Sequence, residues 1–566
     1  MNENQTRRMW VVAAGFIFAT LIIIGRLVVF QVVESAAWEE RGRLATTLEI
    51  IARPERGIIY DSNGTVLAAN GADYQIGASP ALIINPEEVA TQLAPILNLS
   101  RYDILALLES NYPFVTLSGR VSAEVAEAIR ALDYDGLQID PMPRRIYPQG
   151  ELLCHVLGYT DFDGIGGAGL EGYYQAELAG EAARAQINIS PLTQQENVIA
   201  REGSDLVLTI DRTVQHTVEE HLRNAISQYR AESGTIIVMD PRTGAIVAMA
   251  NWPCYDPYRF YEADRDLLQN PAISQQYEPG SVMKVVTMAA ALDSGAANLQ
   301  STYYDSGVIE LGGYPMYNWD RSAPGTTTMS TILARSLNVG AATLAVWMGT
   351  DTYYTYMERF NFGRRTGIDL AAEAAGQMLR PGDELWTETS LGTNSFGQGM
   401  ATTPLQMLLS VSALANDGYL MQPYVVEEIR TGNQVLAHQP TVLSRPIRPE
   451  IAHQVTAMAV NAVNTEVWQA QLAGYTVAGK TGTAQIPENG IYHATETIAS
   501  FVGWFPADKP ELVVLIKLDR PQASPWGSDT AAPTFMEMAT DLVVLMGIPP
   551  DDVRLQADIL AIRDDQ

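Results

Sequence analysis

The strongest pattern in the sequence is an apolar run near the amino terminus. Residues 9–25 carry no charged side chain, and beyond Arg26 the run continues as 27–33. Seventeen uncharged residues lie at the short end of what spans a bilayer, and a snorkelling arginine can extend the span. Two arginines precede the run, which favours an amino terminus in the cytoplasm. We therefore predict a cytoplasmic segment 1–8 and a single-pass transmembrane anchor 9–33.

A cleaved signal peptide is the alternative to an anchor. Ser35, Ala36 and Ala37 would then supply its small-residue cleavage site. Signal peptides have apolar cores of about 7–15 residues, and this run is longer. An uncleaved anchor is therefore favoured, and it predicts that the rest of the chain lies outside the cytoplasm at the cell membrane.

Residues 34–204 alternate short strand-like and helical patterns, which predicts a mixed α/β domain. The segment Ala52–Leu67 reads as strand, Asn-Gly turn and strand. Amphipathic spacing predicts helices over Pro86–Leu97 and Ser122–Leu132.

A second layout occupies residues 205–548. Leu206–Ile210 is extended and Val214–Arg230 is helical, and two hairpins follow, one near each end of the region. The hairpin strands are Thr235–Val238 with Ala245–Ala250 and Ile498–Phe505 with Leu512–Leu518. Helices are predicted over Ser281–Leu292, Met329–Trp347, Pro404–Asn416, Glu450–Val463 and Pro533–Met546. This order predicts an α/β (α+β) fold in which helices flank an antiparallel sheet, followed by a solvated acidic tail, 549–566.

Composition narrows the function classes. There are 36 Lys and Arg against 65 Asp and Glu, a net charge of −29, which disfavours nucleic-acid binding. Cys154 and Cys254 lie far apart and outside any C-x-x-C, so we expect neither a disulfide framework nor a zinc ribbon. The six histidines never fall at a metal-ligand spacing such as H-E-x-x-H.

The first chemical candidate is the sequence Gln276-Tyr-Glu-Pro-Gly-Ser281-Val-Met-Lys284, which opens a helix after Pro-Gly. Ser281 and Lys284 share one helical face because they are three residues apart. A serine hydroxyl needs a neighbour to take its proton, and a lysine whose pKa is lowered by burial or by another cation can do so. A lysine on a solvated helix face is the alternative, since S-x-x-K is common by chance.

Two further segments complete an ordered set. Ser336-Leu337-Asn338 lies on the predicted helix 329–347, and Lys480-Thr481-Gly482-Thr483 lies in a β-rich stretch. S-x-x-K, S-x-N and K-T-G in this order match the motif set of penicillin-binding proteins and class A β-lactamases. Leu337 replaces the usual Asp, which we regard as minor because the flanking Ser and Asn carry the polar groups.

The lysine count supports these positions. Only four of the 36 basic residues are Lys, namely Lys284, Lys480, Lys509 and Lys517, and two of the four fall in the motifs. Arginine does not lose its proton in proteins, whereas lysine can. Compositional bias explains why lysine is scarce but not where the remaining lysines stand.

Two competing motifs are disfavoured by their context. Residues 474–481 fit the P-loop pattern G-x-x-x-x-G-K-[ST], but no strand-like segment precedes them and no helix is predicted after them. Residues 164–169 fit G-x-G-x-x-G, but the segment before them is polar and not a buried strand.

With these motifs, the chain resembles the class B penicillin-binding proteins, which are membrane-anchored D,D-transpeptidases of bacterial cell-wall synthesis. The resemblance spans nearly the whole chain and is closer to the division-type branch than to the elongation-type branch. Further matching segments are Arg53–Ala68, Arg145–Gly150, His155–Tyr159, Gly169–Glu171, Thr209–Asp211, Ser395–Gly399 and Thr403–Gln406. It implies a penicillin-binding/serine-transpeptidase fold over 205–548, preceded by a pedestal (dimerisation-type) domain over 34–204.

The resemblance also implies a role for each motif residue. Ser281 would attack the D-Ala-D-Ala carbonyl of a stem peptide, and Lys284 would take its proton. Ser336 would relay a proton to the departing D-Ala, and Asn338 would orient Lys284 and bind the acyl peptide. The K-T-G segment would bind substrate: Lys480 gives a positive field, Thr481 and Thr483 face the terminal carboxylate, and the backbone N–H groups of Ser281 and Thr483 form the oxyanion hole.

The implied partners are peptidoglycan stem peptides, β-lactams, the membrane, a membrane glycosyltransferase and other divisome or elongasome proteins. No nucleic acid, metal or organic cofactor is implied. A D,D-carboxypeptidase or β-lactamase-like hydrolase would share the motifs but transfer the acyl group to water. A non-catalytic scaffold for cell-wall synthesis is a further alternative, disfavoured because Ser281, Lys284 and Lys480 are intact.

Overall fold

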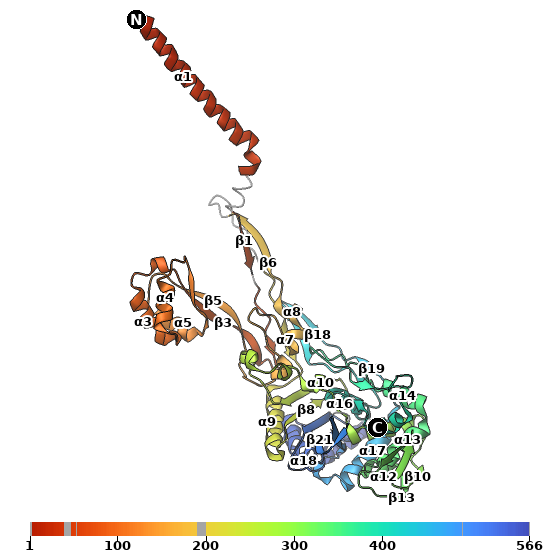
Figure 1. Ribbon diagram of the computed structural model, residues 1–566. Coiled ribbons are helices and arrows are strands. Elements are labelled where there is room, and N and C mark those ends of the chain that lie inside the picture. Colours follow the sequence, from red (N-terminus) through yellow and green to blue (C-terminus); the bar gives the residue numbers. More distant parts are fainter. Residues whose placement is uncertain (1–2, 39–46, 53, 189–199, 489–490, 565–566) are drawn as a thin grey trace. The chain divides into compact units, whose positions relative to one another are not determined.

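The computed structural model describes residues 3–38, 47–52, 54–188, 200–488 and 491–564, so Arg53 and the last two residues of the predicted tail lie outside the description. The chain separates into two compact units (Figure 1). One comprises Met1–Glu55 with Gly180–Gly203, and the other comprises Arg56–Ala179 with Ser204–Gln566.

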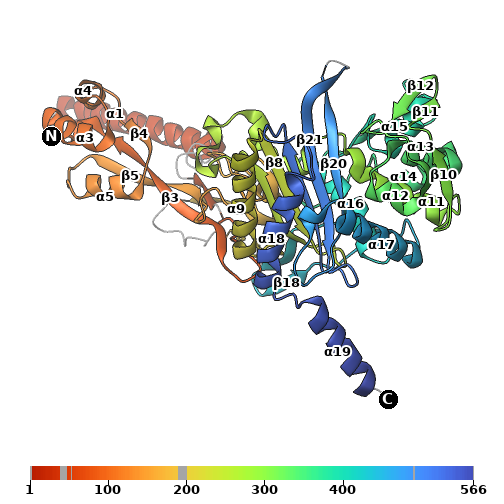
Figure 2. The same cartoon turned by 90° about the horizontal axis from the view of Figure 1, so that it is seen from below.

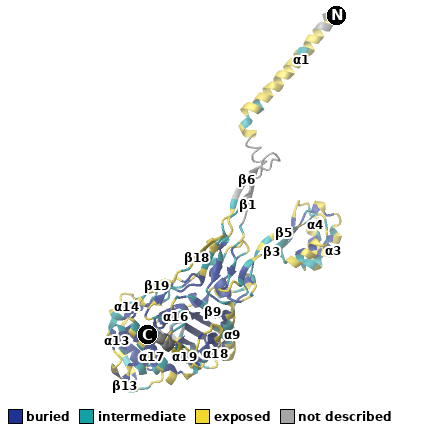
Figure 3. Ribbon diagram, turned by 180° about the vertical axis from the view of Figure 1, so that it is seen from behind, coloured by how far each residue is buried: buried dark blue, intermediate teal, exposed yellow. Residues whose placement is uncertain are grey.

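The first unit contains the apolar helix and a strand pair. Helix α1 (Glu3–Val28) continues into a π-helical turn, η1 (Val29–Val33), and β1 (Thr47–Ala52) pairs antiparallel with β6 (Ala183–Asn188). The stretch Arg7–Val33 has a mean hydropathy of 2.4 and is long enough to cross a membrane. Its apolar side chains are exposed along most of α1 (Figure 3), as expected of a single-pass membrane anchor.

A small α/β subdomain lies at the amino-terminal end of the second unit. Three helices cover strands β3 (Val66–Ala78), β4 (Val115–Val121) and β5 (Leu137–Ile146), with Ile76, Leu93 and Ile104 in its own buried core. The helices are α3 (Pro86–Leu97), α4 (Arg101–Leu108) and α5 (Ala123–Arg130). The predicted helix 86–97 is confirmed at both ends, because Pro86 opens α3 and Asn98 ends it in a left-handed conformation.

The strands of this subdomain belong to a seven-stranded sheet of order β18-β17-β7-β2-β3-β4, in which β5 also pairs with β3. The other strands are β2 (Ile59–Tyr60), β7 (Asp205–Leu208), β17 (Val426–Thr431) and β18 (Gln434–Ala437). The predicted hairpin 52–67 is present as β2, a turn and β3, and Asp61 Oδ1 accepts the N–H groups of Asn63 and Thr65 across the turn. Parallel pairing of β2 with β7 joins segments nearly 150 residues apart.

A second sheet has five antiparallel strands in the order β20-β21-β22-β8-β9, which confirms the predicted antiparallel core. They are β20 (Ala478–Glu488), β21 (Ile491–Phe505), β22 (Leu512–Asp519), β8 (Ser233–Met239) and β9 (Ile246–Trp252). On β8, Ile236 and Val238 enter one buried cluster and Ile237 and Met239 the other. This alternation makes both faces apolar, so helices cover both.

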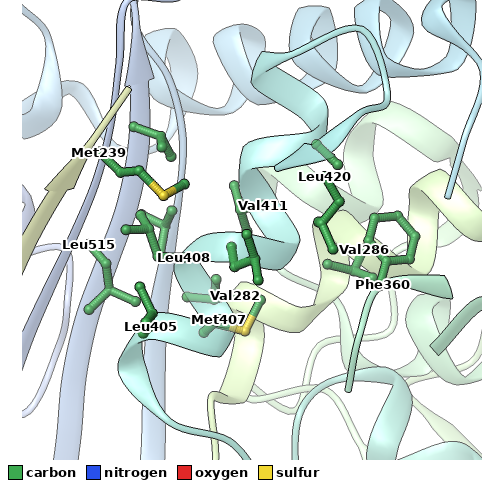
Figure 4. Close-up of a cluster of buried hydrophobic side chains, with 14 of the residues drawn as sticks. Met239, Val282, Val286, Phe360, Leu405, Met407, Leu408, Val411, Leu420 and Leu515 are labelled. Carbon is green, nitrogen blue, oxygen red and sulfur yellow. The ribbon is translucent and has the colours of Figure 1, made fainter. Parts of the chain in front are cut away.

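Helices α9 (Arg212–Tyr229) and α18 (Ala531–Leu545) cover one face of this sheet (Figure 2). Helix α16 (Pro404–Ser412) lies against the other face. Figure 4 shows Leu405 and Leu408 of α16 beside Met239 and Leu515 of the sheet, with Val282 on the far side of α16. Helix α16 therefore separates the sheet from helix α11 (Met283–Asp293), which follows Ser281.

A helical lobe completes the second unit. Its helices are α12 (Met329–Ala334), α13 (Asn338–Met348), α14 (Thr350–Arg359), α15 (Glu388–Ser395) and α17 (Pro449–Thr465). The prediction of one continuous helix over 329–347 is wrong. Ser336 has φ +57° and sits in a turn between α12 and α13, a conformation that no helical residue adopts.

Short elements connect these pieces. They are the helices α6 (Cys154–Leu157), α7 (Gly169–Tyr173), α8 (Gln175–Ala179) and α10 (Pro271–Ser274), the 3₁₀ turns η2 (Pro80–Leu82), η3 (Pro257–Glu262), η4 (Arg265–Leu268), η5 (Gly280–Val282), η6 (Ala413–Ala415) and η7 (Trp468–Ala470), and the strands β10 (Thr302–Asp305), β11 (Val308–Leu311), β12 (Tyr314–Tyr317), β13 (Gly325–Thr328), β14 (Gln377–Met378), β15 (Met400–Ala401), β16 (Leu420–Met421) and β19 (Val442–Ser444).

One expectation about this unit is corrected. Cys154 and Cys254 form a disulfide, because the fold brings α6 against the loop after β9 although 100 residues separate them in sequence. Much of the predicted acidic tail forms helix α19 (Asp551–Asp564), and most of the residues over 551–557 are exposed. Its first turn is held by Asp551, which accepts from Thr476, and by Arg554, which pairs with Asp508.

Candidate active site

Ser281 lies in η5, the 3₁₀ turn that leads directly into α11. Gly280 has φ +57°, and a Cβ added to Gly397 would lie 2.2 Å from the Gly280 carbonyl oxygen. Glycine is therefore required at both residue 280 and residue 397, where the two backbone segments come close together. The close packing fixes the direction in which the Ser281 hydroxyl leaves the backbone.

Lys284 is almost completely buried, with 1% of its surface exposed. Its Nζ donates to Ser336 O at 2.5 Å and to Asn338 Oδ1 at 2.7 Å, and it lies 3.0 Å from Ser281 Oγ and 3.1 Å from Ser336 Oγ. Among the described residues Lys284 forms no ion pair. Burial and the nearby charge of Lys480 hold the pKa of Lys284 well below its usual value, so the neutral amine is favoured.

The turn between α12 and α13 brings the second motif to this amine. Its left-handed residue, Ser336, turns both its carbonyl and its hydroxyl toward Lys284. Asn338 begins α13, and its Nδ2 donates to the carbonyl of Tyr317 at 3.0 Å, which fixes the amide so that Oδ1 faces Lys284. The break that the sequence did not predict is thus what places Ser336 and Asn338 at the site.

The third motif lies on β20, the edge strand of the five-stranded sheet. Lys480 pairs with Val502 of β21, and its buried Nζ donates to Thr481 O at 3.1 Å. Burial lowers the pKa of Lys480 to about 7. Its place within an antiparallel strand also agrees with the prediction that residues 474–481 are no P-loop.

Gly482 allows β20 to approach the Ser281 segment. A Cβ at this position would lie 2.3 Å from Ser500 Oγ and 2.9 Å from Val282 Cγ2. A side chain at residue 482 would therefore push the edge strand away from η5. Lys517, by contrast, is a buried lysine with a structural pairing: its Nζ contacts Asp519 Oδ1 at 2.5 Å.

The site opens into a cavity of about 1190 Å³. Of the predicted residues, Ser281, Asn338 and Thr483 line it. Lys284 and Lys480 are buried and are not lining residues. The lining residues of the cavity also do not include Ser336, Thr481 or Gly482. The structure thus brings the first two motifs together around the Lys284 amine, and Ser281 of the first motif and Thr483 of the third line the same cavity.

Sequence reasoning missed two aromatic residues of the cavity. Trp319 and Trp526 line it, and their rings meet edge to face with centroids 5.4 Å apart. Both stand in loops, where no periodicity predicts what a side chain contacts. Their only signal is the position of each: Trp319 precedes the second motif, and Trp526 follows the last sheet strand.

Comparison with known proteins agrees with this geometry. Residues 234–540 match the family model described as the penicillin binding protein transpeptidase domain, and residues 51–208 match the penicillin-binding protein dimerisation domain. The chain is 32% identical to stage V sporulation protein D of Bacillus subtilis, over 97% of this chain and 87% of the relative. The chain belongs to the class B penicillin-binding proteins.

Other relatives and solved structures agree with this membership. The probable peptidoglycan D,D-transpeptidase PenA of Neisseria meningitidis is 30% identical over 97% of this chain and 94% of its own length. A peptidoglycan synthetase structure from Bifidobacterium adolescentis matches with 26% identity and a TM-score of 0.72, covering 89% of this chain and 98% of that one. Penicillin binding protein 3 of Mycobacterium tuberculosis, complexed with aztreonam, matches with 26% identity and a TM-score of 0.70, covering 88% and 98%.

Family membership confirms the predicted enzyme class. The chain is a serine-type peptidoglycan D,D-transpeptidase and a target of β-lactams. It also confirms the predicted fold, and α1 agrees with a membrane protein.

Proposed function

We propose that Ser281 is the nucleophile of this transpeptidase and that Lys284 is the base that activates it. The observation that carries this proposal is the 3.0 Å distance between Lys284 Nζ and Ser281 Oγ. Burial and the charge of Lys480 lower the pKa of Lys284, which favours the neutral amine. A neutral amine at this distance can accept the hydroxyl proton while the oxygen attacks the penultimate D-Ala carbonyl. Terminal D-Ala then leaves, and an ester on Ser281 remains.

The other motif residues take supporting roles in this proposal. Ser336 returns a proton to the departing D-Ala, since its hydroxyl lies 3.1 Å from the same amine. Asn338 orients Lys284 and binds the acyl peptide. Lys480 supplies positive charge behind Thr481 and Thr483, which receive the terminal carboxylate. The backbone N–H groups of Ser281 and Thr483 form the oxyanion hole.

We further propose the organisation and setting of the whole chain. Residues 1–8 are cytoplasmic, 9–33 span the membrane, 34–204 form the pedestal, 205–548 form the extracytoplasmic transpeptidase domain, and 549–566 follow it. A membrane glycosyltransferase supplies the glycan strands whose stem peptides are joined. The resemblance of residues 157–164 to the division-type branch favours a division-type role over an elongation-type role.

Labelling with a fluorescent penicillin tests the site. The wild-type protein is expected to form a stable covalent label, and Ser281→Ala is expected to form none. Ser306→Ala is the matched control, because Ser306 is an exposed serine in the helical lobe. Equal labelling of Ser281→Ala would refute the nucleophile assignment. Rapid loss of the label from wild type would favour the hydrolase alternative.

A further inference from the structure

A short loop packs against the turn that joins α12 and α13. The loop comprises residues 318–322, directly after β12, and two of its side chains contact the turn. The Trp319 indole N–H donates to the carbonyl of Arg335 at 3.1 Å, and the Arg335 guanidinium pairs with Asp320 at 3.2 Å. The loop therefore holds the residue that immediately precedes Ser336.

Asn318, the first residue of this loop, is bonded on both sides of Asn338. Its Oδ1 accepts the backbone N–H of Val339 at 3.1 Å. The carbonyl of Tyr317, which belongs to the same peptide group as the Asn318 nitrogen, accepts from Asn338 Nδ2 at 3.0 Å. The side chain of Asn338 and the peptide group that follows it are thus both held from Asn318 and its own peptide group.

Asp305 in turn fixes the amide of Asn318. Asn318 is 1% exposed, and Asp305 has no exposed surface. Asn318 Nδ2 donates to both carboxylate oxygens of Asp305 at 3.0 Å and to the carbonyl of Ser322 at 3.1 Å. Asp305 also accepts from the N–H of Gly307 at 2.8 Å and from the Tyr303 hydroxyl at 2.6 Å. The amide of Asn318 therefore has one orientation, in which its nitrogen faces oxygens and its oxygen faces an N–H group.

Two features of this arrangement cost stability. The carboxylate of Asp305 is buried, and among the residues that the structure describes no ion pair compensates it, which is unfavourable even when hydrogen bonds surround it. Ser336 has φ +57°, a conformation that a residue other than glycine keeps only where its surroundings impose it. Because both costs fall beside Asn338, the arrangement indicates positioning of this residue rather than packing alone.

We propose that Asn318, held by Asp305, is a positioning residue of the transpeptidase, which places Asn338 so that its Oδ1 meets the Lys284 amine. This inference rests on the proposed function, in which Lys284 takes the proton of Ser281. Asp305 does not line the cavity, so its effect reaches the amine through Asn318 and Asn338. Without the Asn318 amide, Asn338 is free to shift, and the 2.7 Å contact that orients Lys284 is weakened.

A double-mutant cycle in the full-length protein tests this inference. The second-order rate of labelling by fluorescent penicillin at pH 7 is measured for Asn318→Ala in the wild-type protein and in Asn338→Ala. In the wild-type protein, Asn318→Ala should lower the rate about tenfold, because the hydrogen bonds that hold Asn338 are lost. In Asn338→Ala, the same change should lower the rate less than about threefold, because the amide that it positions is already absent. An equal factor in both backgrounds would overturn the inference.

Asp305 supplies a second pair of variants, which decides the question if Asn318→Ala does not fold. Asp305→Asn keeps an oxygen that can accept from Asn318 and Gly307, so labelling should stay within about threefold of wild type. Asp305→Ala removes the acceptor and should lower the rate about tenfold, and only while Asn338 is present. Equal labelling of Asp305→Asn and Asp305→Ala would overturn the role of this pair.

Asn270→Ala is the matched control for the loss of a buried asparagine. Asn270 is 5% exposed and caps α10 by accepting the N–H of Ala272 at 3.0 Å. Any effect of this variant on labelling should be the same with and without Asn338, and the urea midpoint of each variant shows that folded proteins are compared. A wild-type protein that takes no label would overturn the proposed function, whereas equal effects of Asn318→Ala in both backgrounds overturn the positioning role alone.

Discussion

Lys284 Nζ lies 3.0 Å from Ser281 Oγ, one turn along the segment that η5 and α11 form. The spacing comes from the helix, but the chemical character of the amine comes from its surroundings. Burial and Lys480 both disfavour its protonated form, and its other contacts are a carbonyl, a hydroxyl and an amide oxygen. No carboxylate of the described residues pairs with Lys284, and an amine without such a partner is suited to take a proton from serine.

The first prediction concerns the charge of Lys480. Because this charge lowers the pKa of Lys284, its removal should raise that pKa. The acid limb of penicillin labelling, where Lys284 becomes protonated, should then move to higher pH in Lys480→Gln, and labelling at neutral pH should fall at least about tenfold. Second-order labelling rates from pH 5 to 10 measure the limb.

Lys509→Gln is the matched control for this change. Lys509 is exposed in the loop between β21 and β22, so its removal changes net charge equally but leaves the site untouched. Its pH profile should coincide with that of wild type. An acid limb of Lys480→Gln that stays in place would show that Lys480 does not set the pKa of Lys284.

The second prediction uses Asn338, whose Oδ1 lies 2.7 Å from Lys284 Nζ. Asn338→Asp puts a negative charge beside the amine, which favours its protonated form and raises the pKa of Lys284. Labelling at pH 7 should drop at least about tenfold and recover partly above pH 9. Asn338→Ala loses the same amide without adding charge, so its loss of rate should not recover with pH.

Local sequence signals predicted a helix and singled out motif residues that the structure brings together around Lys284. Helix α3 and the motifs could be predicted because their signals lie in residues that are close in sequence. Pro86 marks a helix start, and Ser281 stands three residues before Lys284. Convergence of the motifs could be expected only from their known grouping, because 55 residues separate Ser281 from Ser336 and 144 separate Ser336 from Lys480. Their distances depend on how η5, α13 and β20 pack.

Features set by tertiary packing were not predictable in the same way. The pattern over 329–347 is apolar enough for one helix, and only packing around Lys284 requires the left-handed turn at Ser336. Trp319 and Trp526 meet because two loops from different elements face one cavity. The disulfide has the same origin, since spacing alone carries no information on which cysteines a fold brings together.

The third prediction concerns two buried ion pairs that share Glu171 in the amino-terminal part of the second unit. Glu171 is fully buried and binds Arg56 and Arg145, each at 2.6 Å. Glu171→Gln leaves two largely buried guanidinium groups without their counter-charge, which should destabilise the fold by about 3–5 kcal/mol. The urea midpoint of unfolding measures this. Glu87→Gln, which breaks the exposed pair with Arg101, should cost only about 0–1 kcal/mol.

The last prediction concerns the disulfide between Cys154 and Cys254. It closes a loop of 100 residues, so opening it enlarges the unfolded ensemble far more than it changes the folded contacts. Around it, the Tyr255 hydroxyl donates to the carbonyl of Cys154 at 3.1 Å, and the His155 ring packs edge to face on Tyr255. These contacts should keep the segments around Cys154 and Cys254 folded when the disulfide is absent. We therefore expect Cys254→Ser to lower stability by about 2–5 kcal/mol while penicillin labelling remains.

Urea unfolding with and without a reducing agent checks this prediction. Reductant should lower the urea midpoint of wild type to that of Cys254→Ser and leave the variant unchanged, because only wild type has a disulfide to lose. If reductant leaves the wild-type midpoint in place, the two cysteines are not joined in the protein. If penicillin labelling is lost together with stability, the disulfide also positions the segment from η3 to α10 that leads to Ser281. The disulfide would then be needed for the geometry of the active site.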